Sequence, residues 1–175
     1  ENELKNRCKL LFPIENAFAM MQFEEALSRK IIHQLKYRSQ EKVGEILANW
    51  TIERLRFDTD KPDVLVTVPL HPKKLKKRGY NQLHLFADTL SKNWSIPHYK
   101  EFLKRNTYQK AQATKDKSHR LETQYNFSTT ENIDGKHFLL IDDVFTTGNT
   151  MSAIAWEILK NKNNKISILV MAYDG

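Results

Sequence analysis

The spacing of apolar residues divides the chain into alternating strands and helices. Short runs rich in β-branched and aliphatic residues predict strands, while apolar residues three or four positions apart predict helices with one buried face. The predicted strands are 17–23 (a strand or a hairpin arm), 64–70, 96–103, 137–142 and 165–172, and the predicted helices are 24–37, 41–56, 81–94 and 150–160. Strands that alternate with helices indicate an α/β fold with a mostly parallel sheet and right-handed crossovers.

Two of the runs are apolar almost throughout. Residues 64–70 (VLVTVPL) and 137–142 (HFLLID) have the pattern of parallel strands that are buried on both faces. The stretch 104–125 is polar, basic and aperiodic, and it predicts an exposed loop or a short helix. A chain of 175 residues suits one domain with a core of this kind.

Composition excludes several classes of protein. No apolar stretch approaches the roughly 20 residues that span a bilayer, and no signal-peptide pattern opens the chain. One cysteine, Cys8, cannot build a disulfide framework or a thiolate zinc cluster, and the six histidines show neither HxH nor HExxH spacing. We therefore expect a cytoplasmic protein with no membrane segment and no metal site built from protein ligands alone. Motifs of dinucleotide-binding and Walker-type sites do not occur either.

The charge balance points to an anionic partner. Lys and Arg number 28 against 21 Asp and Glu, which gives a formal net charge of +7. Phosphates of a small substrate and the backbone of a nucleic acid both fit such a surface, and so does an ordinary basic protein with no specific anion.

Two carboxylates stand where the predicted strand 137–142 ends. An apolar interior would not tolerate Asp142 and Asp143 unpaired, so they are expected at the carboxyl end of the strand, where open α/β sheets bind ligands. The turn that follows offers hydroxyls, backbone N–H groups and a helix N-terminus to one anion, and its glycine permits close approach or a positive φ. Its residues are Thr146, Thr147, Gly148, Asn149 and Thr150. Ribose 5-phosphate presents the matching phosphate and vicinal hydroxyls.

A structural alternative exists for the parts of this string. An isolated Asp-Asp pair is more often a plain turn, and Asn149 or Thr150 is often a simple N-cap. The complete string 139–150 (LLIDDVFTTGNT) favours a ligand site. It resembles the phosphoribosyl pyrophosphate signature of type I phosphoribosyltransferases. The resemblance implies that Asp142 and Asp143 contact the ribose hydroxyls, and that the residues from Thr146 to Thr150 surround the 5-phosphate.

Other segments narrow the resemblance to one family. Residues 68–74 (VPLHPKK), 77–82 (KRGYNQ) and 33–37 (HQLKY) are similar to stretches of the ComF family, whose members are phosphoribosyltransferase-like and often associated with natural competence. The likeness covers about 14–172. It implies a single type I phosphoribosyltransferase domain over 1–175. Residues 1–60 would supply a strand and helices that contribute to a small hood, and residues 61–175 the core.

The resemblance also implies a second subsite and shows two departures. The loop after the first core strand holds pyrophosphate in this fold, which places Leu70, His71 and Lys73 beside the leaving group. ComF proteins commonly carry a four-cysteine zinc module upstream, and the given sequence does not contain one. Within 104–125 the likeness is weak, because the spacing from Thr107 to Gln112 is wider than usual.

A basic and amide-rich stretch follows that loop. Its members predict a cationic rim and a mobile lid or stacking platform that would contact pyrophosphate or nucleic acid; they are Lys74, Lys77, Arg78, Tyr80, Asn81 and Gln82. The alternative for the cationic run is a solvated basic helix start.

Two functions stay open from the sequence. The first is an enzyme that binds phosphoribosyl pyrophosphate with Mg²⁺, held by the substrate and by Asp142 and Asp143, and transfers phosphoribosyl to an unidentified nitrogen acceptor, with no side chain as nucleophile. The second is a non-catalytic module of the same fold that binds single-stranded DNA in competence or DNA uptake. The acceptor and the oligomeric state, with a homodimer among the options, are left open.

Overall fold

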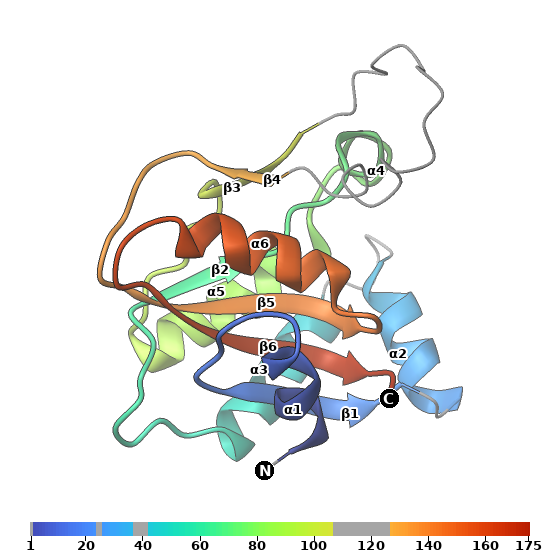
Figure 1. The fold of residues 1–175 in the computed structure, drawn as a ribbon. Helices are drawn as coiled ribbons and strands as arrows, with labels where there is room; N and C mark the ends of the chain where they lie inside the picture. Colours follow the sequence, from blue (N-terminus) through green and yellow to red (C-terminus); the bar gives the residue numbers. More distant parts are fainter. Residues whose placement is uncertain (1, 24–25, 37–41, 107–126) are drawn as a thin grey trace, which may run out of the picture.

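A parallel sheet of four strands forms the centre of the molecule (Figure 1). The computed structural model describes residues 2–23, 26–36, 42–106 and 127–175. Its elements, in chain order, are α1 (Glu3–Lys9), β1 (Ala17–Gln22), α2 (Ala26–Leu35), α3 (Lys42–Arg54), β2 (Val64–Thr67), α4 (Pro72–Arg78), α5 (Gln82–Trp94), β3 (Leu103–Arg105), β4 (Phe127–Thr129), β5 (His137–Phe145), α6 (Asn149–Leu159) and β6 (Lys165–Tyr173). The predicted alternation of strands and helices is confirmed.

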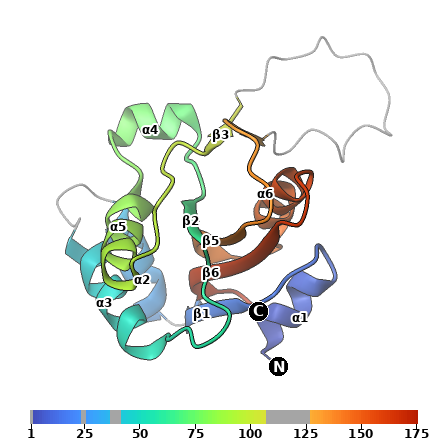
Figure 2. The same cartoon turned by 90° about the vertical axis from the view of Figure 1, so that its left-hand side faces the viewer.

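The strand order in the central sheet is β1-β6-β5-β2, and every neighbouring pair is parallel. All four residues of β2 are buried, as are the first five of β5 and all but the first of β6. These strands carry aliphatic side chains on both faces because each face of the sheet is covered by helices. In Figure 2, α2, α3 and α5 lie on one side of the sheet, and α1 and α6 on the other.

A second, smaller sheet lies beyond β2. It pairs β3 with β4 in the antiparallel direction, and together with α4 it extends past the edge of the central sheet (Figure 1). The prediction of a strand over 96–103 is therefore wrong. Pro97 has no N–H to donate, and this segment makes only an isolated bridge between His98 and Leu65 before it turns at Tyr99–Phe102. Of the stretch 104–125, Lys104 and Arg105 belong to β3, and residues 107–125 lie outside the described residues.

Residues 1–60 supply one edge of the central sheet. The segment predicted as a strand or a hairpin arm is a strand, because β1 runs parallel to β6 with Ala17 opposite Ile168. Helix α1 is not predicted by the sequence. It has only seven residues, but Asn2 caps its first turn by accepting from the Lys5 N–H at 2.7 Å. No described helix is long and apolar enough to cross a membrane.

Candidate functional site

The two candidate carboxylates lie near the carboxyl end of β5. The strand continues three residues beyond the predicted boundary, to Phe145. Burial is complete through Ile141 and becomes partial at Asp142 and Asp143. The order of the sheet puts this strand end between the carboxyl ends of β2 and β6. The central position gives a ligand access to residues from several elements at once.

Both carboxylates turn toward the backbone that follows them. Asp142 Oδ1 accepts a hydrogen bond from the Asp143 N–H, and Asp143 Oδ1 accepts one from the Val144 N–H, each at 2.8 Å. Burial, and next the negative charge of Asp143, raise the pKa of Asp142 well above its usual range. A second negative charge at this position is therefore costly. A cation or hydroxyl donors at this position would relieve that cost.

Asp143 is also held by residues from α5 and from the end of α2. Its Oδ2 accepts from Gln82 Nε2 at 3.1 Å and lies 4.0 Å from Lys36 Nζ. The carbonyl oxygen of the same Gln82 amide accepts from Arg78 Nη1. The buried Gln82 amide thus connects Arg78, at the end of the basic helix α4, to the candidate ribose-binding carboxylate of Asp143. Lys36 and residues of the stretch 77–82 therefore lie beside the motif 139–150.

The turn after β5 has the geometry of an anion site. Gly148 has φ +80° and is the N-cap of α6, where no side chain of a described residue caps the helix. The open N–H groups of the first turn and the helix dipole are available to an anion. Thr146, Thr147 and Asn149 are exposed and Thr150 is half-buried, so all four candidate phosphate-binding side chains are accessible.

A side chain at position 148 would force its neighbours to move. An added Cβ would lie 2.5 Å from Leu11 Cδ1 and 2.7 Å from Phe145 Cζ, and the positive φ would add strain. Leu11 comes from the connection after α1, far from Gly148 in sequence. The glycine was predicted from the sequence, but its contact with Leu11 was not, because no local pattern in the segment after α1 indicates it.

The loop after β2 joins the same edge of the sheet. The Val68 N–H donates to the Ile141 carbonyl at 2.9 Å, and Asn81 Nδ2 donates to the Val68 carbonyl at 3.1 Å. Leu70 and His71 are half-buried, and Lys73 is exposed. His71 Nδ1 accepts from the Lys73 N–H at 3.2 Å and so caps α4. The assignment of pyrophosphate to this loop stays a prediction.

Helix α4 is basic and lies at the surface. None of its residues is buried, and its exposed lysines are Lys73, Lys74, Lys76 and Lys77. The amide residues that follow are different, because Asn81 and Gln82 are only 6% exposed, and Tyr80 donates its hydroxyl to the Leu35 carbonyl. Any nucleic-acid contact from this stretch would therefore fall to Lys74, Lys77 and Arg78 rather than to the amides.

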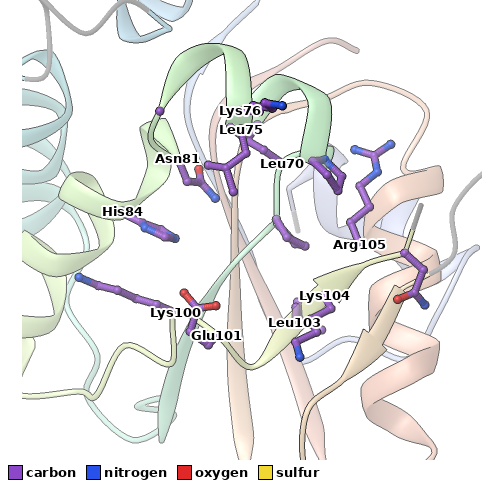
Figure 3. A pocket seen from close by; sticks show the side chains of 14 residues that line it. Leu70, Leu75, Lys76, Asn81, His84, Lys100, Glu101, Leu103, Lys104 and Arg105 are labelled. Carbon is purple, nitrogen blue, oxygen red and sulfur yellow. The ribbon is translucent and has the colours of Figure 1, made fainter. Parts of the chain in front are cut away.

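A cavity of about 630 Å³ lies between α4, the start of α5 and residues 100–106 (Figure 3). Prolines and leucines form much of its lining, including Leu70 and Leu75, and cationic side chains such as Lys76 and Lys104 join them. It adjoins the predicted pyrophosphate loop through Leu70.

The described residues contain no group of three or more His, Cys, Asp or Glu side chains that could hold a metal ion. Asp142 and Asp143 are two carboxylates at an open edge, which suits an ion that brings its other ligands with a phosphorylated substrate. Cys8 is buried, and desolvation raises the pKa of its thiol to about 12, so it is no nucleophile at neutral pH.

The fold and this edge define the class. Residues 33–175 match the phosphoribosyl transferase domain family, and the chain belongs to that family. The fold predicted from the sequence is thereby confirmed. A solved structure, adenine phosphoribosyltransferase from Leishmania donovani, is similar over 90% of this chain and 84% of that chain, with a TM-score of 0.47 and 13% identity.

The predicted likeness to ComF proteins is confirmed as well. The chain is 28% identical to competence protein F of Haemophilus influenzae, over 71% of this chain and 58% of that protein. It is 29% identical to competence protein ComFC of Bacillus subtilis, over 71% and 50%, and 29% identical to the DNA utilization protein YhgH of Escherichia coli O157:H7, over 75% and 60%. The matched region thus spans half to three fifths of these relatives.

Proposed function

We propose that the chain binds phosphoribosyl pyrophosphate together with Mg²⁺ at the carboxyl end of β5 and transfers its phosphoribosyl group to a nitrogen acceptor. One observation carries the proposal: a pair of half-buried carboxylates near the end of β5 is followed, after a short turn, by Gly148 at the N-cap of α6, where no side chain of a described residue caps the helix. The first feature suits vicinal hydroxyls and the second suits a phosphate, and ribose 5-phosphate presents both.

Each part of the site has a distinct role in this proposal. Asp142 and Asp143 accept from the ribose hydroxyls, while the turn 146–150 donates to the 5-phosphate. The loop around Leu70, His71 and Lys73 donates to the departing pyrophosphate. The C1–oxygen bond to pyrophosphate breaks as the acceptor nitrogen bonds to C1, and the chain contributes positioning and stabilisation of negative charge. No protein nucleophile is required.

Magnesium fits the donor set. Mg²⁺ prefers oxygen ligands, keeps several waters and is commonly held by one or two carboxylates together with substrate phosphates. Asp142 and Asp143 would provide the protein ligands. The bound ion would supply positive charge that neutralises the pyrophosphate and lowers the pKa of Asp142 toward its ordinary range.

Calorimetric titration of phosphoribosyl pyrophosphate in Mg²⁺ buffer tests the proposal. We expect saturable binding of one ligand per chain, and no binding when Asp142→Asn is combined with Asp143→Asn in a protein that still melts cooperatively. The variant keeps amide acceptors at both positions, so its fold should persist. A well-folded wild-type chain that shows no binding would overturn the proposal. Once binding is established, turnover is sought by screening nitrogen acceptors for pyrophosphate release.

A second candidate is supported by the surface of α4. Its four lysines are exposed, and relatives of the chain carry the names competence protein and DNA utilization protein. In this alternative the fold binds single-stranded DNA, with phosphates on α4 and without turnover. Anisotropy of a labelled oligonucleotide at several salt concentrations tests it. Affinity that falls steeply with salt supports it, and an absence of binding at low salt contradicts it.

A further inference from the structure

Helix α1 lies on the same face of the sheet as α6 (Figure 2), and its Arg7 reaches the turn between β5 and α6. Arg7 Nη2 donates to the Thr146 carbonyl at 2.9 Å. Arg7 Nη1 donates to the Asp174 carbonyl at 3.0 Å and to the Tyr173 hydroxyl at 3.2 Å. The guanidinium thus connects the turn 146–150 to the end of β6.

Aromatic rings hold the guanidinium in place. Its central carbon lies 5.9 Å from the centre of the Phe145 ring and 5.5 Å from that of Tyr173. The strand ends under it are joined as well, because the Asp174 N–H donates to the Phe145 carbonyl at 2.9 Å. Planar stacking together with several donors in a fixed fork is a geometry that arginine provides and lysine does not.

The contact with Thr146 fixes the direction of a peptide group. In a trans peptide the C=O and the following N–H point to opposite sides. A Thr146 carbonyl that points at Arg7 therefore turns the Thr147 N–H away from Arg7, toward the opposite side of the turn. There are no cis peptides among the described residues, so this holds for the 146–147 bond. Arg7 thus orients one of the donors proposed to bind the 5-phosphate.

A second contact comes from the chain that follows α1. Trp156 Nε1, on α6, donates to the Leu11 carbonyl at 3.0 Å, and the Leu11 side chain fills the space beside Gly148. The segment from Arg7 to Leu11 therefore touches both the turn and the helix that follows it.

Arg7 also brings charge. Its hydrogen-bond partners are two backbone carbonyls and a hydroxyl, and the carboxylates of Glu3 and Asp174 interact with it electrostatically beyond hydrogen-bond distance. A positive charge against the Thr146 carbonyl adds to the favourable potential for an anion at the N-terminus of α6.

We propose that Arg7 is a positioning residue for the 5-phosphate subsite: it holds the peptide between Thr146 and Thr147 in the orientation that presents an N–H to the phosphate. The proposal rests on the proposed function, since it assigns the turn to the same phosphate. Arg7 lies outside the region 33–175 that matches the phosphoribosyl transferase domain.

The test compares two ligands of the same site in Arg7→Ala, Arg7→Lys and the wild type. Arg54→Ala is the matched control, because Arg54 also stacks on an aromatic ring, Trp50, but lies at the end of α3, away from the turn. Calorimetry is run with ribose 5-phosphate and with inorganic pyrophosphate. We expect Arg7→Ala to weaken ribose 5-phosphate binding by about tenfold, because hydrogen bonds that orient a charged-ligand site are removed. Pyrophosphate affinity and the control should change less than about twofold.

Arg7→Lys separates orientation from charge. Lysine keeps the charge but cannot span the Thr146 and Asp174 carbonyls at once, so this variant should bind ribose 5-phosphate at least about threefold more weakly than the wild type. Wild-type affinity for ribose 5-phosphate in folded Arg7→Ala would overturn the proposal, and so would an equal loss for both ligands. If Arg7→Ala does not fold, the result for Arg7→Lys decides. Failure of the wild type to bind either ribose 5-phosphate or phosphoribosyl pyrophosphate would instead overturn the proposed function, and a wild type that binds only the latter is compared with the variants on that ligand.

Discussion

The turn after β5 and the helix α4 both offer positive potential to an anion, yet they are built in opposite ways. Each is bounded by a glycine with positive φ, +80° at Gly148 and +83° at Gly79. A Cβ at Gly148 would collide with Leu11 and Phe145, whereas a Cβ at Gly79 would meet nothing within 4 Å. Leu11 and Phe145 thus enclose the turn on the side of Gly148, while α4 is a cationic helix in solvent.

The charged side chains near the turn and on α4 also differ in their exposure to solvent. The side chain of Asp143 is 17% exposed and is contacted by Gln82 and Lys36, while the lysines of α4 lie at the surface. Enclosed polar groups discriminate between ligands by geometry, and exposed charges attract any anion in a salt-dependent way. The comparison therefore predicts specific recognition at Asp143 and general affinity for anions at α4.

Replacing the two glycines by alanine should give the largest contrast. At Gly148 a methyl group adds steric overlap to the strain of a left-handed backbone, and we expect a decrease of about 2–5 kcal/mol in the free energy of unfolding together with a complete loss of phosphoribosyl pyrophosphate binding. At Gly79 only the backbone strain remains, about 1–2 kcal/mol. Urea unfolding and calorimetry measure both. Equal destabilisation by the two substitutions would contradict the enclosed turn.

Asp142→Asn should separate binding from stability. The substitution removes a carboxylate whose pKa is raised by burial and by Asp143, so it should abolish Mg²⁺-dependent binding without lowering the melting temperature of the empty protein. Because the pKa of Asp142 is higher in the folded than in the unfolded protein, its contribution to stability is fully present at pH values below the unfolded pKa. It disappears as the pH rises through the folded pKa.

The pH dependence of the melting temperature provides a control for the prediction on Asp142→Asn. The melting temperature of Asp142→Asn minus that of the wild type should be larger at pH 8 than at pH 4, because only the wild type loses stability when this carboxyl group ionises. Thermal scans without ligand at both values measure it. A difference that is larger at pH 4 would mean that Asp142 is stabilised as a carboxylate, in conflict with its burial beside Asp143.

The sheet was predictable from the sequence because its strands obey a simple rule. Runs such as 64–70 and 137–142 are apolar almost throughout, which is the pattern of a strand covered on both faces. The pair at Asp142 and Asp143 was equally readable, since carboxylates cannot follow such a run except near its end. The prediction failed in 96–103, where Pro97, which has no N–H to donate, and a turn at Tyr99–Phe102 replace a predicted strand.

The residues of the candidate site could be predicted from the sequence, but the residues that hold them in place could not. The turn 146–150 could be identified from composition, because hydroxyls, a glycine and a following helix are local features. Arg7 could not, because its meeting with Thr146 depends on where α1 packs. Gln82 was expected in a mobile or stacking role and is instead buried against Asp143, a contact that depends on how α5 is placed beside β5.

The Gln82 amide gives a prediction of intermediate size. Gln82→Ala removes the donor to Asp143 and leaves a half-buried carboxylate oxygen with one partner fewer, so unfolding should be easier by about 1–2 kcal/mol and phosphoribosyl pyrophosphate affinity lower by about three- to tenfold. Thr89→Ala on the same helix is the control, since it removes a side-chain hydrogen bond within α5, to the Leu85 carbonyl. Calorimetry should show a change in affinity only for Gln82→Ala, and equal affinities in both variants would contradict the role given to Gln82.

The smallest effects on stability are expected on α4. Lys74→Gln with Lys77→Gln alters two exposed side chains of a helix with no buried residue, so the free energy of unfolding should change by less than about 0.5 kcal/mol per site. Affinity for phosphoribosyl pyrophosphate should change by about twofold or less, because the enclosed turn provides the specific contacts.

If α4 follows a nucleic-acid backbone, the salt dependence of single-stranded DNA binding should fall by about 0.7 in log–log slope for each DNA phosphate that a replaced lysine had neutralised. Anisotropy titrations at several salt concentrations measure that slope in the variant and the wild type. A variant whose affinity for phosphoribosyl pyrophosphate falls more than its affinity for DNA would instead assign this helix to the pyrophosphate subsite and remove the distinction between the two regions.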